Sequence, residues 1–136
     1  MGNRKDDAMT RRIITPPGLP DLPGGYAPAV EVSGAGRTLY VSGTVPVDAA
    51  GHTPPDFEGQ CRLVWANIEA VLKAADMDFD NLVKVTTYLA DRKYNLDNRR
   101  IRQELLGDRR FALTVILPAI FDEAWLIEIE AVAWAA

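Results

Sequence analysis

The sequence predicts an α+β fold, a two-layer sandwich in which a mixed β-sheet carries two helices on one face. Three observations support this. The length of 136 residues suits a single domain. Residues 57–75 and 96–106 place apolar side chains three or four positions apart, as amphipathic helices do. Five shorter segments read as strands and complete the order ββαβαββ. These predicted strands are residues 29–32, 38–42, 82–89, 112–117 and 126–134.

The chain before the first predicted strand is expected to be irregular. Residues 1–12 are polar and are predicted to form a flexible N-terminal tail, with residues 13–136 as the single domain. Residues 16–28 hold five prolines and three glycines, a composition typical of turns. The strands at 29–32 and 38–42 are separated by a Ser-Gly-Ala-Gly turn, so we expect them to pair as a hairpin.

Both predicted helices have recognisable ends. Asp56 is a suitable N-cap for the helix at 57–75. The second helix is expected to start near Asn95 and to stop at Gly107. Cys61 lies on the apolar stripe of the first helix and is expected to be a core thiol. Three arginines of the second helix are expected to form a solvated face: Arg99, Arg100 and Arg102.

The last predicted strand divides its side chains between two different faces. Four apolar residues suit packing under the helices: Ile127, Ile129, Ala131 and Ala133. The opposite face mixes large apolar groups with carboxylates: Leu126, Glu128, Glu130, Val132 and Trp134. This second face is either open to water, as in many antiparallel sheets, or covered by another subunit. A covered glutamate would need a partner or would have a raised pKa, and the pattern leaves both arrangements open.

Composition and charge narrow the class of protein. The net charge of −4 argues against a nucleic-acid binder, which normally carries a basic face. A single cysteine excludes an internal disulfide and a multi-cysteine metal site. No apolar stretch has the length of a membrane span, and the first residues lack the apolar core of a secretory signal. We therefore expect a cytoplasmic protein that binds neither nucleic acid nor membranes.

Five motifs occur in order along the chain. They are residues 24–30 (GGYAPAV), 39–46 (LYVSGTVP), 67–75 (NIEAVLKAA), 82–91 (LVKVTTYLAD) and 127–133 (IEIEAVA). Together they resemble the RidA/YjgF family of reactive-intermediate deaminases. The resemblance implies a chorismate-mutase-like fold and a homotrimer whose sheets form a barrel, with small-molecule clefts between subunits. It also implies hydrolysis of 2-imino or enamine acids to a 2-oxo acid and ammonia, without a metal or an organic cofactor.

The same resemblance assigns the expected site residues. Active members carry an arginine in a Pro-Ala-Arg-Ser/Thr segment, which would clamp the substrate carboxylate. An ungapped count back from the closing strand puts Leu113 at the arginine position and Thr114 at the next. The glutamate expected to transfer protons is Glu128. The other substrate-binding positions implied by the family pattern are Tyr26, Ser42, Gly43 and Asn98. For a deaminase, backbone N–H groups near Thr114 and Val115 are the expected donors to the developing negative charge.

Replacement of the arginine by leucine leaves two functions open. One is an imine or enamine deaminase with an altered substrate, and the other is a non-catalytic trimer that binds a small ligand or a protein. Arg109 or Arg110 would replace the missing cation only if a bulge shifted the strand register. Ribonuclease activity, attached to some relatives, is disfavoured by the acidic charge and by the single histidine.

Overall fold

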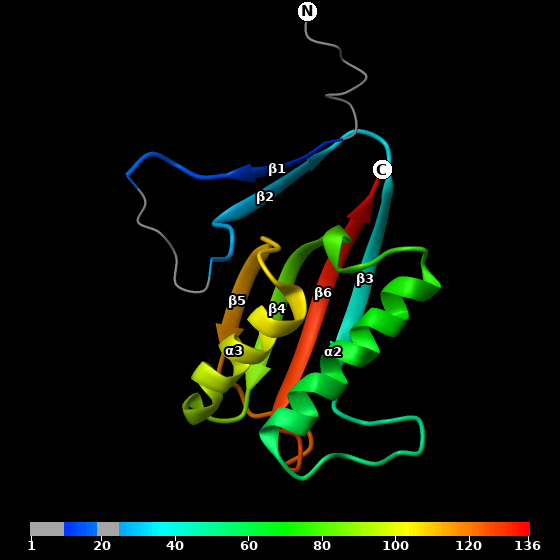
Figure 1. Cartoon of the computed structure of the whole chain (residues 1–136), viewed down its shortest axis with the longest axis vertical. Helices are drawn as coiled ribbons and strands as arrows, with labels where there is room; N and C mark the ends of the chain where they lie inside the picture. The colour runs from blue at the N-terminus through cyan, green and yellow to red at the C-terminus, as the bar shows by residue number, and fades with distance from the viewer. Residues whose placement is uncertain (1–9, 19–24) are drawn as a thin grey trace, which may run out of the picture.

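The computed structural model describes residues 10–18 and 25–136, and it confirms the mixed sheet with two helices on one face (Figure 1). The elements in chain order are β1 Thr10–Ile14, β2 Ala29–Ser33, β3 Arg37–Thr44, α2 Phe57–Ala74, η1 Phe79–Asn81, β4 Leu82–Leu89, η2 Arg92–Tyr94, α3 Asn95–Leu106, β5 Ala112–Ile116 and β6 Ile127–Ala135. The central sheet has the strand order β3-β6-β4-β5. Strand β6 is antiparallel to β3 and β4, whereas β4 and β5 are parallel.

Both helices start and end close to the predicted residues. The Asp56 carboxylate accepts a hydrogen bond from the backbone N–H of Gly59 at 3.2 Å and so caps α2. Helix α3 ends at Gly107, whose φ of 63° lies in the left-handed region that favours glycine. Within the described part of the chain, no helix is long and apolar enough to cross a membrane.

The hydrophobic core lies between the helices and the covered face of the sheet. The four β6 residues predicted to face the helices are at most 3% exposed, and Cys61 is fully buried beside them. The opposite face of the sheet is open in the single chain. Trp134 on β6 is nevertheless 8% exposed, because its ring lies against Gly36, where an added Cβ would be 2.8 Å from a ring carbon.

The predicted hairpin between residues 29–32 and 38–42 is wrong. Strand β2 pairs antiparallel with β1, from Thr10 opposite Ser33 to Ile14 opposite Ala29. Strand β3 pairs instead with β6. Short sequence separation favours a hairpin, but β3 has a longer partner in the nine-residue β6, and the β1–β2 ribbon extends away from the central sheet in Figure 1.

The predicted tail over residues 1–12 extends too far, because β1 includes residues 10–12. Arg11 and Arg12 at the end of this segment both have partners. Arg12 forms an ion pair with Glu31 of β2 at 3.2 Å. Arg11 donates to the backbone carbonyls of Asp80, at 2.6 Å, and of Arg110. Residues 1–9 lie outside the described residues, as do residues 19–24 of the proline-rich segment.

Candidate functional site

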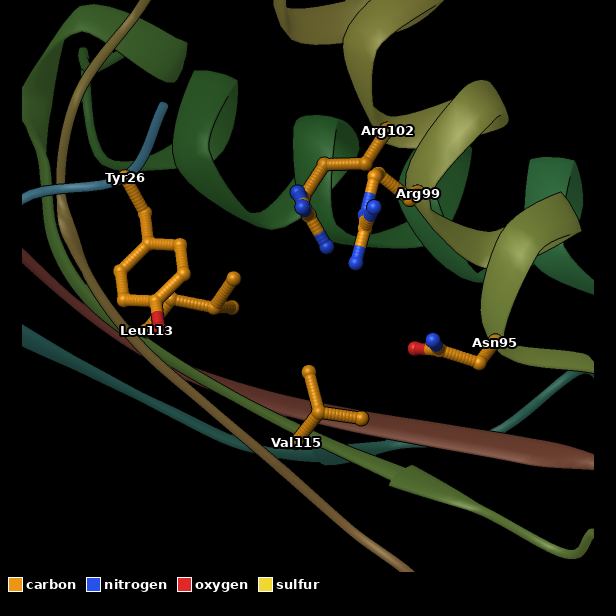
Figure 2. Close-up of a pocket in the computed structure, with 6 residues that line it drawn as sticks. All are labelled: Tyr26, Asn95, Arg99, Arg102, Leu113 and Val115. Atoms are coloured by element: carbon orange, nitrogen blue, oxygen red, sulfur yellow. The ribbon is translucent and has the colours of Figure 1, made fainter. Parts of the chain in front are cut away.

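A pocket of about 230 Å³ lies between α3 and the edge strand β5 (Figure 2). It is lined by Tyr26, Asn95, Arg99, Arg102, Leu113 and Val115. Three of these are predicted site residues: Tyr26, Leu113 and Val115. The other three come from α3 and were not predicted as site residues.

Two elements and one backbone contact position these side chains. Leu113 and Val115 are two residues apart on β5, so both point to the side of the sheet that α3 covers. Arg99 lies four residues after Asn95 on α3, and Arg102 three residues further, which places all three on one side of the helix. Tyr26 is held beside β5 because the neighbouring Ala27 donates its N–H to the carbonyl of Phe111 at 3.0 Å.

The two arginines give the pocket its charge. Figure 2 shows their guanidinium groups projecting into the space opposite Leu113 and Val115, with the Tyr26 ring at one side. Arg102 is 6% exposed, and burial lowers its pKa, with the nearby positive charge of Arg99 lowering it further. The pocket lining contains no carboxylate. An apolar floor under two cations is chemically suited to a small organic anion.

The expectation that all three α3 arginines are solvated is wrong for Arg102. Only Arg100 lies on the outer surface with acidic partners, at 2.7 Å from Glu58 and 3.0 Å from Glu104. Arg102 lies four positions before the buried Leu106 and therefore on the same, inner side of the helix. The four-residue spacing from the apolar Leu106 was a signal in the sequence that could have revealed it.

A second group of predicted residues lies on the open face of the sheet. The Glu128 carboxylate of β6 rests against the backbone of Gly43 on β3, where an added Cβ would be 2.7 Å from Oε2. Ser42 lines a shallow hollow on the same face, together with Tyr40 and Glu130. No larger side chain than glycine fits at position 43 while Glu128 keeps this position.

Glu130 on the same face is engaged by a neighbour. The Tyr88 hydroxyl of β4 donates a hydrogen bond to Glu130, and this bond raises the pKa of Tyr88. Glu128 has no such partner within the described residues. Of the two carboxylates, Glu128 is therefore the one free to act on a bound molecule.

Two predicted site residues, Thr114 and Asn98, belong neither to the pocket lining nor to the group around Glu128. Thr114 points to the open face, where its Oγ1 accepts a hydrogen bond from Lys84 Nζ at 2.7 Å. Asn98 lies on the buried side of α3 and is 1% exposed, and its side-chain amide has no hydrogen-bond partner among residues 10–18 and 25–136. Within one chain, the predicted site is thus divided between a pocket on the helix side of β5 and a carboxylate on the opposite face of the sheet.

Similar proteins cover most of the chain. A family model described as Endoribonuclease L-PSP matches residues 20–135. A RutC family protein of Pyrococcus horikoshii is 29% identical over 126 residues, covering 91% of this chain and 98% of the relative. The 2-iminobutanoate/2-iminopropanoate deaminase of Homo sapiens is 33% identical over 131 residues, covering 93% of this chain and 91% of the relative. A solved structure from Yersinia pestis, YyfB, is a protein of unknown function of the conserved Rid protein family. It matches with a TM-score of 0.81 at 30% identity, covering 93% of this chain and 100% of that one.

Proposed function

This chain belongs to the Endoribonuclease L-PSP family, the RidA/YjgF family that its motifs resemble, and we propose on that basis that it hydrolyses the C=N bond of an imine or enamine. Relatives named 2-iminobutanoate/2-iminopropanoate deaminase support this class of reaction. The observation that carries the proposal is the Glu128 carboxylate, which lies against the bare backbone of Gly43 on the open sheet face. Such a group can transfer protons to and from a molecule bound beside it.

The proposed reaction needs a single proton-transfer group. Water adds to the imine carbon, the C–N bond breaks, and the products are a carbonyl compound and ammonia. Glu128 accepts a proton from the attacking water and returns it to the imine nitrogen, which gives a carbinolamine. It then accepts the proton of the carbinolamine hydroxyl and passes it to the leaving nitrogen, so the carboxylate is regenerated. An enamine substrate first takes a proton on carbon, which the protonated form of Glu128 supplies. Backbone N–H groups near Thr114 and Val115 are the proposed donors to the developing negative charge, since the Thr114 hydroxyl already contacts Lys84.

We further propose that the active cleft forms between subunits of a homotrimer. Tyr26 and Leu113 lie at the β5 edge, whereas Gly43 and Glu128 lie on the opposite face of the sheet. A closed ring of three identical contacts brings the edge of one subunit to the open face of the next, three times over. Tyr40 lies on that open face and is 78% exposed in the single chain. A subunit contact there would bury this large aromatic side chain, which supports the proposal.

The substrate proposed for this chain differs from that of relatives with an arginine at the strand start. A carboxylate placed at position 113 would meet the apolar side chain of Leu113, with no gain to offset its loss of water. The substrate is therefore one whose charged group reaches beyond Leu113.

The test is an assay of ammonia release from a panel of imines generated in situ by a dehydratase or an amino-acid oxidase. We expect at least one imine to be hydrolysed faster than its spontaneous rate. We also expect Glu128→Gln to lower that rate on the order of 10²- to 10⁴-fold. Glu123→Gln is the matched control, because Glu123 is exposed in the loop between β5 and β6.

Two results would overturn the proposal. If no imine in the panel is accelerated, the chain is better described as the non-catalytic binding protein. If Glu128→Gln remains as active as Glu123→Gln, another group transfers the proton. Sedimentation of the wild-type protein tests the trimer separately, and a monomer would remove the shared cleft.

A further inference from the structure

We propose that Arg99 and Arg102 of α3 form a carboxylate-binding site in the pocket beside β5. The ligand class is a small organic acid whose carboxylate meets the two guanidinium groups and whose apolar body lies on Leu113 and Val115. The cation for the ligand is thus supplied by the helix above the pocket and not by the strand beneath it. That the bound acid is the substrate rests on the proposed function, whereas the anion site itself does not.

The charges of Arg99 and Arg102 are not balanced by any residue that the structure describes. In the described ranges of the chain, neither Arg99 nor Arg102 makes an ion pair or a hydrogen bond. Arg102 is nine-tenths buried, so its charge has lost most of its contact with water. A buried charge is costly unless it is paired, and two adjacent cations also repel each other. A bound anion would remove both costs.

The neighbouring Arg100 differs from both pocket arginines. Arg100 has the same side chain on the same helix, and it contacts both Glu58 and Glu104. Acidic partners are therefore present where arginines face the outer surface and absent where they face the pocket. The pattern is the one expected if the partner of Arg99 and Arg102 is a ligand.

The size and lining of the pocket also fit a small organic acid. Its volume of about 230 Å³ is below the range of drug-sized ligand sites, which begin at about 300 Å³, and suits a small metabolite. The planar guanidinium fork matches the two oxygens of a carboxylate. Figure 2 shows the guanidinium groups on one side of the pocket and the side chains of Leu113 and Val115 on the other. A ligand with a charged end and an apolar body fits this arrangement, whereas a bare inorganic anion leaves the apolar side without a partner.

The test measures binding separately from turnover. The purified 136-residue protein is titrated calorimetrically with 2-oxobutanoate, with its neutral amide and with inorganic phosphate. We expect 2-oxobutanoate to bind and Arg102→Met to raise its Kd on the order of tenfold or more. Methionine keeps an unbranched apolar stem at this buried position, and replacing a buried charge by an apolar group is often tolerated.

Two further variants complete the design. Arg99→Gln changes a half-buried residue, so it tests the site even if Arg102→Met fails to fold. Arg100→Gln removes the same charge from the same helix outside the pocket and is expected to change the Kd less than twofold. The inference is overturned if Arg99→Gln and Arg102→Met bind 2-oxobutanoate as wild type does, or if Arg100→Gln weakens binding equally. It is also overturned if the neutral amide or phosphate binds as tightly as 2-oxobutanoate.

The two proposals fail in different ways. Arginine-dependent binding without acceleration of any imine overturns the proposed function and leaves the anion site standing. Acceleration of an imino acid with an unchanged KM in Arg102→Met overturns the anion site and leaves the proposed function standing.

Discussion

The close contact between Gly43 and Glu128 makes Gly43→Ala a test of the position of the carboxylate. The added Cβ would lie 2.7 Å from Oε2 and 3.1 Å from Cδ of Glu128. Ordinary van der Waals contact begins at 3.4 Å, so the carboxylate oxygen must move by about 0.7 Å. A displacement of about 1 Å can lower a rate on the order of 10²-fold, so we expect a loss in kcat/KM of roughly 10- to 100-fold.

The same substitution should leave the fold intact. The atoms that the Cβ meets belong to the end of a flexible side chain, and the φ of Gly43 is not in the left-handed region. We therefore expect the change in Tm to stay within about 2 °C, which corresponds to roughly 0.5 kcal/mol in a domain of this size.

The assay compares imine hydrolysis in Gly43→Ala, Glu128→Gln and the double variant. If the methyl group acts by displacing the carboxylate, the double variant is no slower than Glu128→Gln alone. A double variant that is slower by the full product of both effects would refute this reasoning, as would full activity in Gly43→Ala.

Three other predictions follow from the packing and the charges. In Gly36→Ala the Cβ would be 2.6 Å from a backbone oxygen of β6, which cannot move as a side chain can, so we expect a loss of about 1–3 kcal/mol in urea unfolding. An unchanged unfolding midpoint would contradict this. Burial raises the pKa of Cys61 to about 12, so the native protein at pH 8 should not react with a disulfide reagent that labels it in guanidinium. Rapid labelling of the native protein would show that the thiol is accessible. The hydrogen bond from Arg100 lowers the pKa of Glu58, so its contribution to stability is present above the unfolded-state pKa of about 4.3 and is lost as pH falls through the lower folded-state pKa. The difference in urea midpoint between wild type and Arg100→Gln should therefore narrow below about pH 4, and a constant difference from pH 7 to 3.5 would contradict the assignment.

Local periodicity was enough to predict most of the elements. Both helices follow from apolar spacing, and their ends follow from the capping Asp56 and the left-handed Gly107. The alternation along β6 correctly separated the buried face from the face that carries Glu128. These features depend on residues within a few positions of one another, which is the range over which a single sequence is informative.

The pairing of β2 and the burial of Arg102 could not be predicted from local periodicity. The pairing of β2 with β1 depends on a competition between distant segments, and nothing near Ala29 in the sequence decides it. Arg102 was predicted to be solvated because it is charged, although it lies four residues before the apolar Leu106. Its burial beside the pocket is fixed by how α3 lies over β5. Sequence motifs therefore identified the family but missed the pocket cations, which come from a different element than the motif.

The position of Arg99 and Arg102 also determines how close an anion must come before these two residues attract it. The chain has a net charge of −4, so its field as a whole repels anions, but charges in solution are screened within about 8 Å at physiological salt. A small acid that diffuses to the mouth of the pocket is attracted by Arg99 and Arg102 only over the last part of its path. A long polyanion such as RNA would in addition meet the net negative charge of the rest of the chain. The position of these two charges therefore selects ligands by size as well as by sign.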